Sequence, residues 1–423
     1  MVTERRVKEL LNISKNKNNK IEMNLLIFWT LLRNIVIRFS GSVIFFVVIP
    51  LAARRLEEVE FQFLSYILSF FILFAILFDF GSSIIGIKKI ALNKDNSSFI
   101  NQEISLNFFH RLIVYLISAI ILDRIIYYNF NALYNIKLAL TTTLFYAGFS
   151  LNSIWITQAV DSLNKQMIID FILKFLFPFI LIYYFGHNIL VFIFTLGVCY
   201  FISSFVMWAK YLEKFNIKLI KSFYKDNFSY FFSKVLIAGY TSILPLFAFY
   251  VLSGNDFSFF TISEKLYRGL FSVYGPISQS LFPLFILLSH NNKELFKKNI
   301  LNQLYFQLTL VIIFVIILIY FSNDILILYS KGKFDETSRL SLILMFLSYP
   351  FMVLGNILGL QFLVTQGYIK IMNKCFLAGT LLMVFFMVLR FFNIINLNLG
   401  YLILFSEIIV GFMILYNSYK KWH

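Results

Sequence analysis

Residues 255–291 read NDFSFFTISEKLYRGLFSVYGPISQSLFPLFILLSHN, and this segment is the most informative about the fold. Most of it is apolar enough to lie in a bilayer, yet its first turns hold Glu264, Lys265 and Arg268, and a Gly-Pro pair at residues 275–276 interrupts its middle. A charged residue at mid-membrane costs about 2.5–3.5 kcal/mol, and a broken backbone ladder must be repaired by a neighbouring helix or a wet cavity. We therefore expect this helix to face the inside of a helical bundle, as the broken helices of membrane transporters do.

The composition extends this expectation to the whole chain. Of its 423 residues, 60% are hydrophobic and 14% are charged, whereas soluble domains have about 25% charged residues. Apolar runs recur at the length of about 20 residues that a membrane span needs, so we predict an all-α polytopic membrane protein. We place its 12 transmembrane helices at about 28–52, 61–84, 104–126, 136–157, 169–186, 189–209, 228–252, 255–291, 303–322, 339–364, 372–392 and 398–418.

Two polar segments lie outside these spans. Residues 1–26 are basic, and we interpret them as a cytoplasmic tail. Residues 210–227, KYLEKFNIKLIKSFYKDN, carry an apolar and a lysine stripe at helical spacing. This pattern predicts an amphipathic linker helix on an anionic cytoplasmic surface, and the alternative is a solvated linker. The linker separates an N-terminal bundle (28–209) from a C-terminal bundle (228–423), two pseudo-symmetric units of six helices each.

The net charge of +16 has a topological explanation. In a soluble protein it would suggest nucleic acid, but in a membrane protein it reflects the excess of Lys and Arg in cytoplasmic loops. With the N-terminus inside, roughly 22 of these residues fall in cytoplasmic segments and roughly 7 in external loops. We therefore predict that both termini are cytoplasmic and that the chain binds no nucleic acid. Cys199 and Cys375 lie inside apolar runs and indicate neither a disulfide framework nor a metal site.

The sequence contains no motif of an enzyme. It has no GxxxxGK[ST] phosphate loop, no HExxH and no GxSxG. The predicted loops outside the membrane are also too short to form a catalytic domain. We therefore expect a carrier that is not an enzyme and needs no cofactor, with H⁺ or Na⁺ as the ion that could drive transport.

Basic residues inside the predicted spans indicate an anionic substrate. Several have no acidic residue one helical turn away, so they must find a distant partner or line a wet cavity. The planar arginine fork binds two phosphate oxygens at once. We predict a cationic cavity whose substrate-binding residues are Arg33, Arg38, Arg111, Lys234, Lys265 and Arg268.

Acidic residues inside the spans are fewer and include Asp79, Asp170, Glu264 and Glu407. We take Asp79 and Glu264 as candidates for ion coupling, because intramembrane acids often bind protons or cations. For Asp79 the alternative is a carboxylate at the interfacial end of a helix. For Glu264 it is a simple ion pair with Arg268, four residues on.

Four motifs occur in order along residues 50–367. They are PLAARRL at 50–56, followed by DFG at 79–81 and IKKIA at 87–91; SIWITQAVDSLNKQM at 153–167; FFTISEKLYRGLFSVYGPISQSLFP at 259–283; and LGNILGLQFLVTQG at 354–367. With them the chain resembles the bacterial polysaccharide flippases, the O-antigen translocase (Wzx-type) family of the multidrug/oligosaccharidyl-lipid/polysaccharide (MOP) exporter superfamily. Two departures are Ala159, where that family usually has glycine, and Asp161, where it has glutamate.

The resemblance implies a fold, a function and a location. The fold is two six-helix bundles around a V-shaped central cavity (MATE/MurJ-like). The function is flipping of an undecaprenyl-pyrophosphate-linked O-antigen or polysaccharide repeat unit to the periplasmic leaflet of the bacterial inner membrane, coupled to an ion gradient. Membrane lipids and other polysaccharide-assembly proteins are the further partners. Gln158, Asp161 and Gln279 fall on positions of the family motifs.

Three other functions stay open. An ion-coupled multidrug exporter of the same superfamily should have an acidic cavity for cationic drugs. A membrane-embedded polysaccharide polymerase or ligase should need a sizeable external catalytic loop. A flippase for another lipid-linked precursor would share most of these features.

Overall fold

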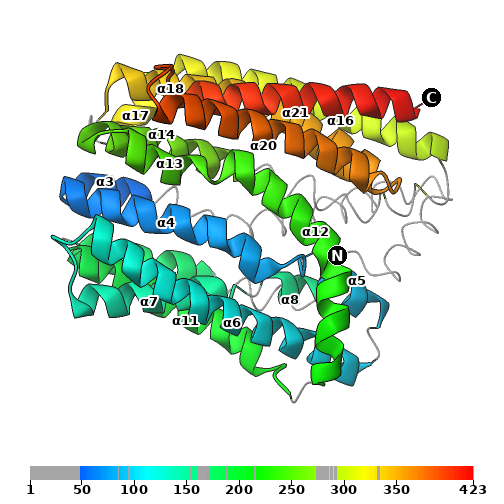
Figure 1. Ribbon diagram of the computed structural model, residues 1–423, viewed down its shortest axis with the longest axis horizontal. Helices are drawn as coiled ribbons and strands as arrows, with labels where there is room; N and C mark the ends of the chain where they lie inside the picture. The colour runs from blue at the N-terminus through cyan, green and yellow to red at the C-terminus, as the bar shows by residue number, and fades with distance from the viewer. Residues whose placement is uncertain are drawn as a thin grey trace, which may run out of the picture. The chain divides into compact units, whose positions relative to one another are not determined.

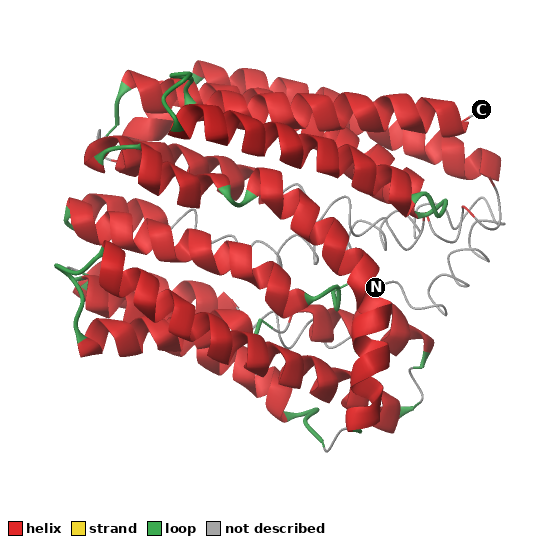
Figure 2. Cartoon of the chain, in the orientation of Figure 1, coloured by secondary structure: helices red, strands yellow, loops and turns green. Residues whose placement is uncertain are grey.

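The computed structural model describes residues 48–423, apart from 84, 94–95, 153, 161–168, 170, 187, 214–215, 273–284, 286–288, 290–292, 331–333 and 423. Within these described residues every regular element is a helix and no strand occurs (Figure 2). The prediction of an all-α fold is therefore confirmed.

Eight helical segments of the described residues are long and apolar enough to cross a membrane. They are Glu58–Asp79 (α4), Ser97–Asn129 (α6), Ile189–Ala209 (α11), Ile220–Val251 (α12 and α13), Lys293–Tyr320 (α16), Glu336–Val364 (α18, α19 and η5), Ile369–Phe391 (α20) and Leu399–Trp422 (α21). Each coincides with a predicted span. The first predicted span lies almost wholly outside the described residues, so the total of 12 stays a prediction.

Shorter helices occupy other predicted spans. The fourth holds α7 (Ile136–Ser150), and the fifth holds the apolar segment Ile172–Phe185. The eighth begins with α14 (Gly254–Ser272), and most of the residues that follow it, including the Gly-Pro pair, lie outside the described residues.

Polar side chains set where several helices begin. The Asn96 side chain accepts a hydrogen bond from the Phe99 N–H at the start of α6, and Asn135 does the same for Leu138 at the start of α7. Asp335 opens α18 with a reciprocal capping box to Ser338. Each cap satisfies an N–H that has no partner within its helix, which is worth about 1 kcal/mol. The loop residues between apolar runs thus determine the helix boundaries.

Contacts group the chain into two compact units. The first unit holds Val43–Ile262 and Leu328–Phe334. The second holds Met1–Ser42, Ser263–Ile327 and Asp335–His423. The grouping does not follow the predicted boundary at 210–227, because α12 and α13 pack on α4 and so belong to the first unit. The two six-helix bundles inferred from sequence symmetry stay a prediction.

The first unit is built around α4, α6, α7 and α11 (Figure 1). Glycines let α7 and α11 approach closely: a Cβ at Gly148 would lie 2.5 Å from the Phe201 nitrogen, and one at Gly197 would lie 3.0 Å from the Phe145 nitrogen. Small residues at helix contacts are the usual means of close packing in membranes. This pair of helices forms the most tightly packed part of the unit.

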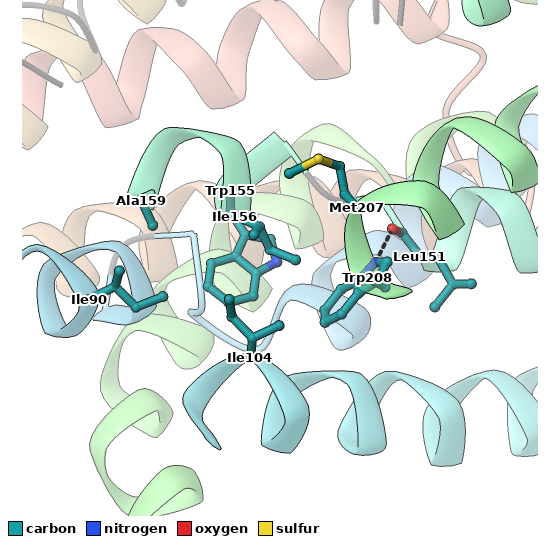
Figure 3. Close-up of a cluster of buried hydrophobic side chains, with 8 residues drawn as sticks. All are labelled: Ile90, Ile104, Leu151, Trp155, Ile156, Ala159, Met207 and Trp208. Carbon is teal, nitrogen blue, oxygen red and sulfur yellow. Dashed lines mark hydrogen bonds between the residues drawn. The ribbon is translucent and has the colours of Figure 1, made fainter. Parts of the chain in front are cut away.

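A cluster of eight buried residues joins the ends of α6 and α11 to two short helices, α5 (Ile85–Leu92) and α8 (Ile154–Ala159) (Figure 3). The rings of Trp155 and Trp208 pack edge to face with centroids 6.1 Å apart. The Trp208 Nε1–H donates a hydrogen bond of 2.6 Å to the Leu151 carbonyl. Trp155, which belongs to one of the four motifs, is therefore a core residue of the first unit.

The segment predicted as a linker helix differs from the expectation. The helix α12 (Ile220–Thr241) begins at Ile220, after a 3₁₀ turn at Ile217–Leu219, and runs directly into the membrane span. Lys218, Lys221 and Lys225 are exposed, whereas Phe223 is buried. The amphipathic pattern is thus real, but burial of one face against the first unit makes its second half part of a longer helix.

The second unit is built around α21, which packs on α18 (Glu336–Leu347), α19 (Tyr349–Leu354), η5 (Gly355–Val364) and α20 (Figure 1). Close approach again uses glycine, since a Cβ at Gly400 would lie 2.8 Å from the Ser341 carbonyl oxygen. The element η5 is a ten-residue π-helix. This form is rare in proteins, and where it occurs it often lies at a functional site. Glu407 lies on α21 within this packed core.

Candidate functional site

The chain turns sharply where α4 ends at Asp79. Phe80 has φ 38° and Gly81 has φ 80°, both in the left-handed region that glycine adopts easily and other residues do not. Space also requires glycine, because a Cβ at Gly81 would lie 2.9 Å from the Asn227 carbonyl oxygen on α12. The turn therefore fits closely against α12 and brings the Asp79 carboxylate to it.

Asp79 forms an ion pair with Lys234 of α12. The Lys234 ammonium also donates a hydrogen bond of 2.6 Å to the Ser83 hydroxyl, and the Ser83 N–H donates one of 3.1 Å to Asp79 Oδ1. As expected, Lys234 has no acidic residue one helical turn away, and of the two open possibilities it has a distant partner. Its partner lies 155 residues away in the sequence, so no local spacing could reveal it. The pair links α4 to α12 within the first unit.

Arg111 is buried in the first unit, with 3% of its surface exposed. It donates hydrogen bonds of 2.7 Å to the Ser150 carbonyl and 3.2 Å to the Asn152 carbonyl, at the C-terminal end of α7. Its Nε–H donates to Asn107 Oδ1 at 2.7 Å. Cations stabilise helix C-termini because unpaired carbonyls and the helix dipole make them negative. Arg111 thus needs no carboxylate at ion-pair distance, because its charge stabilises the carbonyl groups at the C-terminal end of α7.

The second unit holds a group of three charges on α14. Glu264 and Lys265 are fully buried, and the Lys265 ammonium lies 3.0 Å from Glu264 Oε2. Arg268 forms an ion pair with the other oxygen of the same carboxylate. The predicted Glu264–Arg268 pair is therefore confirmed. Two cations share one carboxylate, so the group, which we call the α14 triad, has a formal excess of one positive charge.

Tyrosines hold the α14 triad against neighbouring helices. The Tyr349 hydroxyl donates a 2.6 Å hydrogen bond to the Tyr267 carbonyl, and the two rings stack with centroids 5.1 Å apart. The Tyr267 hydroxyl lies 3.1 Å from the Ser348 hydroxyl. The Ser263 hydroxyl donates to the Ser338 carbonyl at 2.9 Å. These bonds fix the helix face that carries the charges to α18 and α19.

Several predicted site residues cannot be placed. Arg33, Arg38, Asp161 and Gln279 lie outside the described residues, and nothing is described of the Gln158 side chain on α8. They stay predictions. The described candidates separate into Asp79, Lys234 and Arg111 in the first unit and the α14 triad in the second. Sequence reasoning missed the polar partners Ser83, Asn107 and Ser348, which carry no pattern of their own.

A family model described as "Polysaccharide biosynthesis protein" matches residues 28–289, more than half of the chain. The chain belongs to this family. The family match covers the first three of the four motifs and confirms the resemblance. No curated protein matches the sequence significantly.

This polysaccharide biosynthesis protein is similar in fold to solved transporters of the MOP superfamily. An inward-facing multidrug resistance MATE family transporter has a TM-score of 0.64 at 12% identity, over 93% of this chain and 94% of that one. An outward-facing one has a TM-score of 0.58 at 14% identity, over 93% and 95%. A MOP superfamily transporter from Pyrococcus furiosus, whose binding pocket is described as having reverse polarity, has a TM-score of 0.60 at 14% identity, over 93% and 95%. The family is thus one of polysaccharide biosynthesis proteins, and the fold is shared with solved membrane transporters.

Proposed function

We propose that the chain is a flippase for an undecaprenyl-pyrophosphate-linked O-antigen or polysaccharide repeat unit. It moves this lipid from the cytoplasmic to the periplasmic leaflet of the bacterial inner membrane by alternating access. Membership of the polysaccharide biosynthesis family carries the proposal. The buried positive excess of the α14 triad supports an anionic headgroup as the part that is bound.

The physics of the substrate agrees with this assignment. A pyrophosphate diester carries about two negative charges, and moving one charge through 100 mV is worth about 2.3 kcal/mol. With the cell interior negative, outward movement of the headgroup is electrically downhill by about twice that amount. The attached sugars are the larger obstacle, because hydrocarbon cannot satisfy their hydroxyl groups. A hydrophilic path that opens to one side at a time removes that obstacle.

The described basic residues of the proposed cationic site are not equally suited to bind the pyrophosphate. Lys265 and Arg268 meet at a single carboxylate, so two cations lie together at one place. Lys234 is already paired with Asp79, and Arg111 already serves a helix end. We therefore assign the pyrophosphate first to Lys265 and Arg268, together with Arg33 and Arg38. A proton or Na⁺ gradient is the proposed driving force, and both termini are proposed to be cytoplasmic.

A multidrug exporter of the same superfamily is the alternative that the fold favours, because several structural relatives are multidrug transporters. Such a protein would bind cationic drugs at acidic residues. The α14 triad has the opposite charge balance. A polymerase or ligase has no comparable support from the family and fold.

A deletion strain tests the proposal. Lipid-linked repeat units should accumulate on the cytoplasmic leaflet, where an added membrane-impermeant glycosidase cannot reach them in intact spheroplasts, and surface glycan should disappear. Expression of the intact chain should reverse both effects, and drug sensitivity should not change. Normal surface glycan in a deletion strain without a second flippase would refute the flippase. Drug sensitivity restored by the chain would favour the exporter.

A further inference from the structure

Glu407 is the buried acidic side chain of the second unit, among the described residues, that the proposed function has not used. It lies on α21 with 3% of its surface exposed. Throughout the part of residues 48–423 that the structure describes, no hydrogen bond or ion pair reaches its carboxyl group. An ionised carboxylate buried without a partner is so costly that the group takes up a proton instead.

Asp79 and Glu264, the two carboxylates selected for ion coupling, are in the opposite situation. Asp79 is paired with Lys234, and Glu264 is paired with both Lys265 and Arg268. Cations at this range hold a carboxylate in its ionised form. Asp79 and Glu264 are thus poorly suited to exchange a proton during transport, although sequence reasoning had selected them. Burial without a cation singles out Glu407.

The surroundings of Glu407 connect it to the α14 triad. An ionised Glu407 would act electrostatically on the Tyr267 hydroxyl, on which Arg268 and Glu264 also act. That hydroxyl is held in place by Ser348, 3.1 Å away, and Met352, whose sulfur is 3.0 Å away. Tyr267 is therefore under the influence of two groups: the Glu407 carboxyl, whose charge can change, and the α14 triad, which is the proposed headgroup site.

The remaining ionisable groups near α21 are engaged elsewhere or lie toward the helix ends. The elements packed against α21 are α18, α19, η5 and α20, and η5 carries no ionisable residue. Arg339 of α18 is paired with Glu336, and Arg390 of α20 donates to the Ile395 carbonyl. The ionisable side chains of these elements and of the second-unit part of α14 are Glu336, Arg339, Tyr349, Lys370, Lys374, Cys375, Arg390, Glu264, Lys265, Tyr267 and Arg268.

We propose that Glu407 is the proton-binding residue that couples transport to a pH gradient. In the conformation described here its carboxyl group is protonated. When the transport cycle exposes it to water, the O–H bond breaks, the proton passes to water, and the new negative charge acts on Tyr267 and on the α14 triad beside it. A negative charge there weakens the hold of Lys265 and Arg268 on a headgroup, which gives the proton control over substrate release. This mechanism rests on the proposed flippase function, whereas the protonation state of Glu407 does not.

Infrared spectroscopy tests the protonation state directly. Purified protein in lipid at neutral pH should show the carbonyl stretch of a protonated carboxyl group, and Glu407→Gln should remove that signal. Glu407→Gln keeps the size and neutrality of the protonated residue, so the fold should survive. The matched control is Asp324→Asn, at an exposed carboxylate of α17 (Ser322–Ser330), which should leave the signal unchanged. A Glu407→Gln spectrum identical to that of the intact chain would overturn the proposal.

Transport tests the coupling. Proteoliposomes loaded with undecaprenyl-pyrophosphate bearing a fluorescent repeat unit should flip it faster when a pH gradient is imposed. Glu407→Gln should lose this stimulation, and Glu407→Asp should recover part of it. Full stimulation in Glu407→Gln would exclude Glu407 as the coupling residue. If the intact chain flips nothing, the flippase function fails, and the infrared result still decides whether Glu407 carries a proton.

Discussion

Replacing Glu264 with glutamine should destabilise the protein strongly, because the change removes the carboxylate that neutralises two cations. The Lys265 side chain is 0% exposed and that of Arg268 is 18% exposed, so water cannot replace the lost partner. Removing one member of a buried ion pair costs about 3–5 kcal/mol. That is a large share of a total stability of about 5–15 kcal/mol. Glutamine keeps the shape of the side chain, so the loss reports the charge.

The measurement is reversible unfolding of the purified protein in mixed micelles, followed by tryptophan fluorescence. The matched control is Glu336→Gln, which breaks a pair with Arg339 of similar spacing in which the glutamate is 81% exposed. Surface pairs are worth at most about 1 kcal/mol, so this variant should unfold nearly as the intact chain does. Adding Lys265→Met to Glu264→Gln should recover part of the loss, because it removes one of the two buried cations that lost the Glu264 carboxylate. Equal losses in Glu264→Gln and Glu336→Gln would refute the reasoning.

Three further predictions follow from the same contacts. Arg33→Ala and Arg38→Ala should each reduce glycan export in the complemented deletion strain with normal amounts of protein in the membrane, and unchanged export in both would remove them from the site. Gly148→Ala should lower the free energy of unfolding by about 1–3 kcal/mol, because a Cβ 2.5 Å from the Phe201 nitrogen forces α7 and α11 apart. The control is Gly355→Ala, whose Cβ would meet only Ile414 at 3.9 Å. Equal losses of stability in the two variants would argue against close packing of α7 and α11. Asp79→Asn should lower the free energy of unfolding by about 1–3 kcal/mol, because its pair with Lys234 is only partly buried. The double variant Asp79→Asn/Lys234→Met should recover both stability and export. A double variant that is stable but inactive would show that Asp79 has a role beyond the pair.

The class of fold was within reach of the sequence because the bilayer imposes a length on each apolar run. All eight long apolar segments of the described residues coincide with predicted spans, and the order of motifs was sufficient to identify the family. Helix starts were less predictable, as Ile220 illustrates. The pattern of 210–227 predicted a separate amphipathic helix, but α12 begins only at Ile220, and burial of Phe223 makes its first turns part of a longer span. Periodicity reports a helical face and does not report which neighbour covers it.

Charge pairing shows the same limit more sharply. Glu264 and Arg268 are four residues apart on one helix, so their pairing could be predicted from spacing alone. Asp79 and Lys234 are 155 residues apart and meet only because the turn at Gly81 fits against α12. The sequence around Asp79 could not show whether a cation pairs with it, because that pairing is a property of helix packing. Helix packing also decides the situation of Glu407. The packing of α18, α19, η5 and α20 around α21 buries its carboxyl group with no cation of the described residues at ion-pair distance.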